Sequence, residues 1–130
     1  MNQLLKFLFV FFLAFNAYSH GEDKSGPHQG FVRMPGAFHI EVVPISKNKI
    51  KIYLLDIDWK NPSVKRSSME VTLKTGKDYR ATCKVIKKYF ECAFLESINL
   101  KDTGQLIVLA TREGRKGSEA LYSLPLKLEK

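Results

Sequence analysis

The stretch Arg80-Ala-Thr-Cys-Lys-Val-Ile-Lys-Lys-Tyr-Phe-Glu-Cys-Ala-Phe94 indicates the fold of this chain. If the chain reverses at Lys87-Lys88, Cys83 faces Cys92 and Val85 faces Phe90. One face of the two strands is then apolar, as the alternation of a half-buried β-hairpin requires. The other face carries charged and hydroxyl side chains: Arg80, Thr82, Lys84 and Glu91. We therefore predict a hairpin closed by a Cys83–Cys92 disulfide.

A redox or metal-binding role is the alternative for this cysteine pair. The two cysteines are the only ones in the chain, and their spacing is wider than Cys-x-x-Cys. An oxidising compartment allows such a pair to persist as a structural disulfide. We interpret the pair as structural.

Similar short strand-like runs, separated by turn-forming residues, extend on both sides of the hairpin. We find no internal repeat and no long apolar stripe with helical periodicity. About seven short strands with frequent turns are typical of a small immunoglobulin-like β-sandwich, with a small barrel as the alternative. The expected strands cover residues 38–43, 50–55, 69–74, 79–86, 89–95, 106–111 and 120–128.

The first 19 residues have the pattern of a cleaved signal peptide. Lys6 precedes an apolar run over 8–15, and Ala17-Tyr18-Ser19 places small residues where signal peptidase needs them. The run is shorter than the roughly 20 residues that span a bilayer. We predict a periplasmic or secreted protein with no stable membrane insertion after cleavage. The expected organisation is a signal peptide (1–19), a histidine-containing segment (20–36) and a β-sandwich domain (37–130).

The chain is basic, with 21 Lys and Arg against 13 Asp and Glu and a formal charge of +8. Such a balance suits nucleic acid, an anionic membrane or an acidic partner. The lysines are scattered through strands and turns, and export argues against a nucleic-acid partner. We interpret the charge as a soluble basic surface. No hydrolase triad, phosphate loop or convincing carboxylate pair is recognisable, so no enzyme is predicted.

The histidines indicate where chemistry occurs. His20, His28 and His39 are the only three in the chain, and they lie within twenty positions of one another. His39 and Glu41 are two apart on a predicted strand and so share one face, while the flexible turn over 26–30 can bring His28 back to it. Imidazole suits copper and zinc, and a carboxylate can complete such a site.

Two further features extend this candidate metal site. Met34 adds a thioether that favours Cu(I), and Asp56 and Asp58 are acids able to hold ligands in place. Cleavage after Ser19 makes His20 the first residue, so its α-amine and imidazole can chelate one metal; a second histidine would complete a histidine brace, a copper geometry. We predict a copper site, with zinc as the alternative, formed from His20, His28, His39, Glu41 and Met34. The rival hypothesis is a non-catalytic envelope interaction module with incidental histidines.

Residues 20–30 (HGEDKSGPHQG), followed by Phe38-His-Ile-Glu-Val-Val43, resemble a pattern in periplasmic heavy-metal resistance proteins and in the N-terminal parts of some efflux adaptor subunits. In those proteins an H-G-x-x-G-G element precedes a strand ending in E-[LV]-V. Tyr53-Leu-Leu-Asp56 followed by Lys60-Asn-Pro62 is similar to their next strand and turn, and Gln29 departs from their usual glycine.

This resemblance covers roughly residues 20–75. It implies copper or zinc binding by His28, His39 and Glu41, for metal sequestration, delivery or resistance. Besides the metal ion, we expect a metal-efflux or envelope protein as partner. His20 alone resembles the N-terminal histidine of the copper-resistance protein C family, which is also a β-sandwich.

Overall fold

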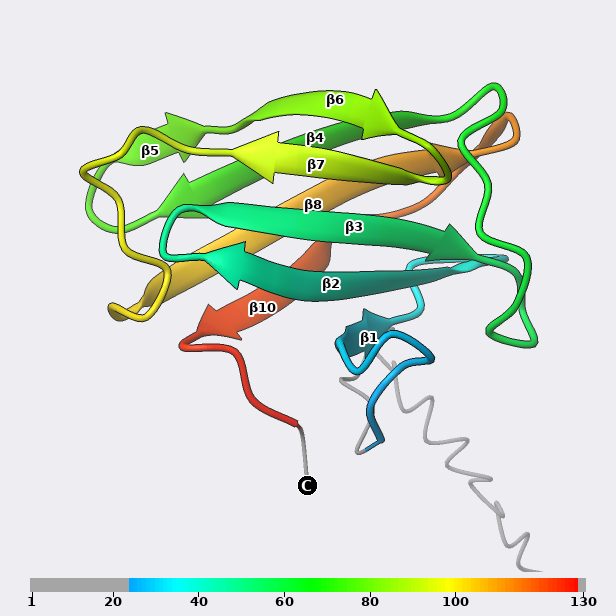
Figure 1. The fold of residues 1–130 in the computed structure, drawn as a ribbon, viewed down its shortest axis with the longest axis horizontal. Coiled ribbons are helices and arrows are strands. Elements are labelled where there is room, and N and C mark those ends of the chain that lie inside the picture. Colours follow the sequence, from blue (N-terminus) through cyan, green and yellow to red (C-terminus); the bar gives the residue numbers. More distant parts are fainter. Residues whose placement is uncertain (1–23, 129–130) are drawn as a thin grey trace, which may run out of the picture.

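The computed structural model describes residues 24–128, which form an all-β unit of two antiparallel sheets (Figure 1). The predicted signal peptide and His20 lie outside the described residues. Within residues 24–128 there is no helix long and apolar enough to cross a membrane. The strands are β1 (Phe31–Arg33), β2 (His39–Ser46), β3 (Lys49–Leu55), β4 (Ser68–Lys74), β5 (Asp78–Arg80), β6 (Thr82–Ile86), β7 (Tyr89–Ala93), β8 (Gly104–Arg112), β9 (Arg115–Lys116) and β10 (Ala120–Leu124).

The two sheets enclose one hydrophobic core. The first sheet has the order β1-β2-β3-β7-β6, and the second has the order β10-β8-β4-β5 with β9 added to β8. Alternate residues of each strand point inward, as the period of two requires. The inward residues of the central strands are almost fully buried: Ile40, Val42, Ile50, Ile52, Leu54, Val71, Leu106 and Val108. Each such side chain contributes roughly 1.5–3 kcal/mol of burial free energy to the fold.

The predicted hairpin and its disulfide are confirmed. Cys83 pairs with Cys92 and Val85 with Phe90 across β6 and β7, and the two cysteines are bonded. Cys92 is fully buried and Phe90 nearly so, whereas Val85 is 52% exposed because β6 is an edge strand. The alternation of the sequence was sufficient to set this register.

The prediction of one strand over 79–86 was wrong. This segment forms β5 in the second sheet and β6 in the first, and the chain changes sheets at Ala81. The N–H of Ala81 donates to the carbonyl oxygen of Val71 at 2.9 Å, which marks the crossing point. Both halves keep period-two alternation, so the sequence carried no sign of the change.

Two short strands, β1 and β9, were not expected, and the described residues contain ten strands rather than about seven. β1 lies inside the segment 20–36, which we expected to precede the sandwich, and it pairs with β2 as an edge of the first sheet. Val32 is fully buried there. Flanking glycine and proline residues made the segment look like a loop.

β1 is also fastened to β10, the edge of the second sheet. The Tyr122 hydroxyl donates to the carbonyl oxygen of Phe31 at 3.0 Å. Nε of Arg33 donates to the carbonyl oxygen of Leu121 at 3.0 Å, and its guanidinium lies 4.2 Å from the centre of the Tyr122 ring. These contacts hold the start of the described chain against the sandwich. The candidate site lies where this first segment meets β2.

Candidate functional site

The buried carboxylate of Glu41 is the centre of the candidate site. Glu41 is on β2 and has no exposed surface. Its Oε2 accepts hydrogen bonds from the backbone N–H groups of His28 (2.8 Å) and Gly30 (2.9 Å). Its Oε1 lies 2.7 Å from Nδ1 of His28. One side chain therefore binds both the backbone and the imidazole of the loop that carries His28.

The loop closes tightly over this carboxylate. The N–H of Gly26 donates to the carbonyl oxygen of Gly30 at 3.0 Å, and the N–H of Gln29 donates to that of Gly26 at 2.9 Å. A Cβ atom on Gly30 would lie 2.6 Å from the carbonyl oxygen of Val42 and 2.8 Å from Cγ of Glu41. Only glycine fits this approach without displacing the strand or the carboxylate.

The imidazole of His28 is held on its flat face as well. It stacks on the Tyr53 ring with centroids 3.6 Å apart and planes 2° apart. Tyr53 is the β3 residue directly opposite Glu41. Burial raises the pKa of the Tyr53 hydroxyl, and Tyr89 and Glu41 raise it further. His28 thus keeps 35% of its side chain exposed while its orientation is set from two directions.

His39 is oriented by a different part of the chain. It is 4% exposed, and its Nδ1 lies 3.1 Å from the carbonyl oxygen of Asp56. Trp59 packs against the ring at 5.4 Å between centroids, with planes tilted by 57°. His39 and Glu41 project from the same face of β2, so both histidines lie on the outer side of the first sheet.

The Asp56 carboxylate stabilises the turn that supplies this carbonyl group. Oδ1 accepts the N–H groups of Asp58 and Lys60, both at 2.9 Å, and Oδ2 accepts Nδ2 of Asn61 at 2.8 Å. The backbone N–H of Lys60 and then the Asn61 amide hold the pKa of the Asp56 carboxyl below its ordinary value. Asp56 therefore acts on the turn, and Asp58 lies exposed within it.

In their neutral form, both histidines carry the ring proton on Nδ1. The partner of each Nδ1 is a carboxylate or a backbone carbonyl, which can only accept a hydrogen bond. Nδ1 must therefore donate, and in the neutral ring the lone pair belongs to Nε2. No residue within 24–128 forms a hydrogen bond with either Nε2 atom. No fully buried side-chain nitrogen or oxygen in this range lacks a partner, so both Nε2 atoms retain contact with solvent.

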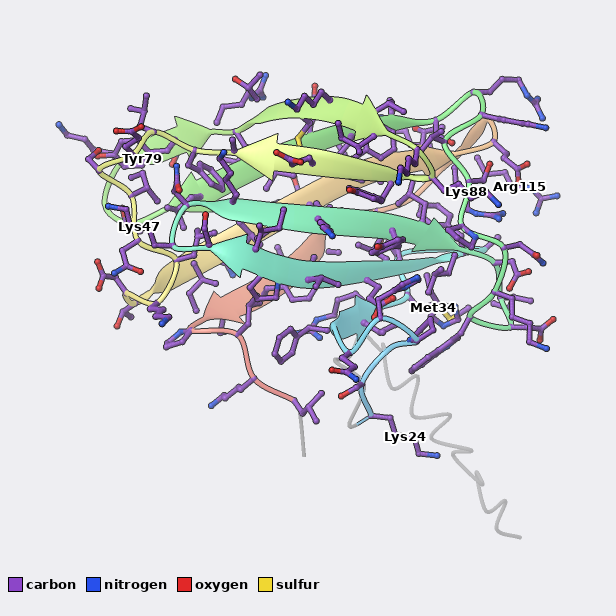
Figure 2. The ribbon with its side chains drawn as sticks, viewed as in Figure 1. Lys24, Met34, Lys47, Tyr79, Lys88 and Arg115 are labelled. Carbon is purple, nitrogen blue, oxygen red and sulfur yellow. A yellow bond between two sulfur atoms is a disulfide. The ribbon has the colours of Figure 1, made fainter. Side chains whose placement is uncertain are left out.

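The structure brings together only some of the predicted ligands. His28 and Glu41 are in contact, and His39 shares the face of Glu41. Met34 is 41% exposed. It lies just after β1 and is labelled in Figure 2. Among residues 24–128 no group of three or more His, Cys, Asp or Glu side chains is placed to hold a metal ion. His20, the remaining predicted ligand, lies outside the described residues.

No protein-family model, curated protein or solved structure matches this chain. Its function is therefore inferred from the chemistry of its own residues. Sequence reasoning did not include Tyr53 and Trp59 in the site. Tyr53 could have been predicted, because a hairpin between the expected strands over 38–43 and 50–55 places residue 53 opposite Glu41. Trp59 had no such signal, since its position depends on the turn at Asp56.

Proposed function

We propose that this chain is an exported metal-binding protein that holds copper, or alternatively zinc, through the Nε2 atoms of His28 and His39. The supporting observation is that both histidines direct Nδ1–H to an oxygen acceptor and leave Nε2 free within the described residues. Histidines that bind metals in proteins almost always donate their other ring N–H to a carboxylate, a carbonyl or water. Such a bond selects the tautomer that binds metal and orients the ring.

In this proposal Glu41 positions His28 and is not itself a ligand. Both of its oxygens already accept hydrogen bonds, and the side chain is fully buried. Two imidazoles do not complete a copper or zinc site, so a further ligand is required. After signal-peptide cleavage His20 would supply its α-amine and imidazole, and Met34 remains a candidate fourth ligand for Cu(I).

Export and metal handling are consistent with the other features of the chain. The sequence over 1–19 has the signal-peptide pattern, and a disulfide persists in an oxidising compartment. The resemblance to periplasmic heavy-metal resistance proteins favours sequestration or delivery of the ion to an envelope or efflux partner, without catalysis. We infer that the sandwich is of the immunoglobulin-like type.

Metal titration of the mature, untagged protein beginning at His20 tests this function. We expect one Cu(II) per chain, with an affinity that falls as the pH is lowered because protons compete for the ring nitrogens. His28→Ala and His39→Ala should each weaken binding by at least about tenfold, and Met34→Leu should affect Cu(I) only. A variant with one extra residue before His20 has no free α-amine on that histidine, so its loss of affinity measures the contribution of the amine.

A triple variant lacking all three histidines is the decisive comparison. If it bound copper as tightly as the wild type, the metal-binding function would be rejected. The alternative, an envelope interaction module with incidental histidines, would then be favoured. Circular dichroism and the unfolding temperature of each variant show whether a loss of affinity arises from misfolding.

A further inference from the structure

Two turns and the short strand β9, at one end of the sandwich, each carry a pair of adjacent cations. Lys65-Arg66 lies between β3 and β4, Lys87-Lys88 joins β6 to β7, and Arg115-Lys116 follows the turn after β8. All six side chains are exposed. We call these six residues the basic end. They are scattered in the sequence, and the fold gathers them.

Direct contacts join the turns of the basic end. The N–H of Gly114 donates to the carbonyl oxygen of Arg66 at 3.0 Å. This bond joins the turn between β8 and β9 to the segment between β3 and β4. Lys65 and Lys88 line one surface hollow of about 480 Å³. Lys88 and Arg115 lie at the same end of the molecule in Figure 2, opposite the end where Lys47 lies. The three cation pairs therefore lie at one end of the molecule.

Three carboxylates lie near the basic end, and Glu70, which lines a hollow with Lys116, forms no ion pair within residues 24–128. Glu113 pairs with Arg112, whose Nη1 lies 2.9 Å from its carboxylate. Asp56, which lines the same hollow, accepts three hydrogen bonds from its own turn. Within residues 24–128, none of the six cations of the basic end forms an ion pair. Their charge is available to a partner.

Two of the six cations lie at backbone positions that suit glycine or asparagine better. Arg66 has φ 49° and Lys87 has φ 52°, in the left-handed region where glycine or asparagine is more stable. Lys87 is the first residue of a two-residue hairpin loop, a position where positive φ favours glycine. Long basic side chains at such positions are therefore not the residues that stability alone favours.

We propose that the basic end docks on an anionic phospholipid surface. Four of its cations lie in two turns and the other two form β9, so all six lie at one end of the molecule, where they can face a continuous layer of negative headgroups. Each cation near such a surface contributes attraction that acts within a Debye length. Val85, half exposed on β6 beside the Lys87 turn, adds apolar area to the same end. This proposal is independent of the metal site.

Vesicle flotation with the mature full chain tests this docking. The probe is a vesicle with about one-third phosphatidylglycerol in phosphatidylcholine, compared with pure phosphatidylcholine in about 0.1 M salt. The triple variant Lys65→Ser, Lys87→Asn, Lys116→Ser should bind the anionic vesicles on the order of 100-fold more weakly than the wild type. The matched control Lys47→Ser, Lys77→Ser, Lys101→Ser removes the same charge from exposed residues of the opposite end and should stay within about twofold of the wild type.

Three outcomes would overturn the proposal. The first is no binding of the wild type to anionic vesicles. The second is an equal loss of vesicle affinity in both triple variants, which would show that the vesicles attract the net charge of the protein and not the basic end. The third is tighter binding to a soluble poly-glutamate peptide than to vesicles, which would indicate an acidic protein as partner. Lys87→Asn alone separates function from folding: its unfolding temperature should rise while its vesicle affinity falls roughly fivefold. An affinity equal to that of the wild type would exclude Lys87 from the docking surface.

Discussion

Nδ1 of His28 lies 2.7 Å from Oε1 of Glu41, thirteen residues further along the chain. The carboxylate is completely buried, yet the imidazole that it binds is partly exposed. A buried carboxylate is unfavourable unless hydrogen bonds compensate it, and here two backbone N–H groups and one ring N–H do so. The pair therefore links the stability of the N-terminal loop to the orientation of a proposed metal ligand.

Replacement of Glu41 by glutamine tests this link. The amide keeps the size of the side chain but places a donor against groups that are themselves donors. We expect Glu41→Gln to lower the free energy of unfolding by about 2–3 kcal/mol, measured in urea, and to weaken copper binding by about 10–100-fold. Glu70→Gln, at an exposed position on β4, is the control. Unchanged stability would contradict the role of Glu41 as the anchor of the loop.

Gly30→Ala should disturb the same contact by crowding. The added Cβ would lie 2.6 Å from a backbone oxygen of β2, which cannot rotate away. We expect a loss of about 1–3 kcal/mol in unfolding free energy and a shift of the His28 ring resonances in NMR spectra. Gly36→Ala is the matched control, because its nearest non-neighbouring atom is 3.7 Å away. If both variants were equally stable, the loop would not be as tightly packed as described.

The disulfide should contribute to stability and leave the metal site unaffected. Cys83 and Cys92 are separated by nine positions, so their bond restricts a short loop in the unfolded chain. The double variant Cys83→Ser, Cys92→Ser should lose about 2–3 kcal/mol by thermal or urea unfolding. Its copper stoichiometry should equal that of the wild type. A change in stoichiometry would assign the cysteines to the metal site instead.

Because the Tyr122 hydroxyl is buried, we expect the protein to lose stability in alkaline solution. Burial raises the pKa of this hydroxyl well above the ordinary value of 10. In the unfolded chain the hydroxyl ionises near pH 10, whereas in the folded protein it stays protonated. Stability is therefore fully present below pH 10 and decreases above it, by roughly 1.4 kcal/mol per pH unit for this group.

Urea midpoints between pH 8 and 11 measure this dependence. Tyr122→Phe should be about 1 kcal/mol less stable at pH 7, because the carbonyl oxygen of Phe31 loses its donor. Its stability should decline less steeply than that of the wild type above pH 10. Parallel declines in the two proteins would show that other groups cause the alkaline effect.

The candidate site was only partly predictable from the sequence. The three histidines and Glu41 were identified from residue type and spacing, and the strand pattern placed His39 and Glu41 on one face. The role of Glu41 in orienting His28 was not predictable, because it depends on the 26–30 loop closing over β2. The contact of His39 with the Asp56 carbonyl depends in turn on the conformation of a loop after β3.

The sequence by itself determined the all-β class, most of the strands and the register of the disulfide hairpin, because alternation of apolar and polar residues is a local property of the chain. Only the tertiary structure decided that residues 79–86 divide between two sheets and that β1 closes an edge. It also decided that six cations from two distant turns and from β9 lie at one end of the molecule. Those relationships arise from packing between segments far apart in sequence, which a periodicity of two residues does not encode.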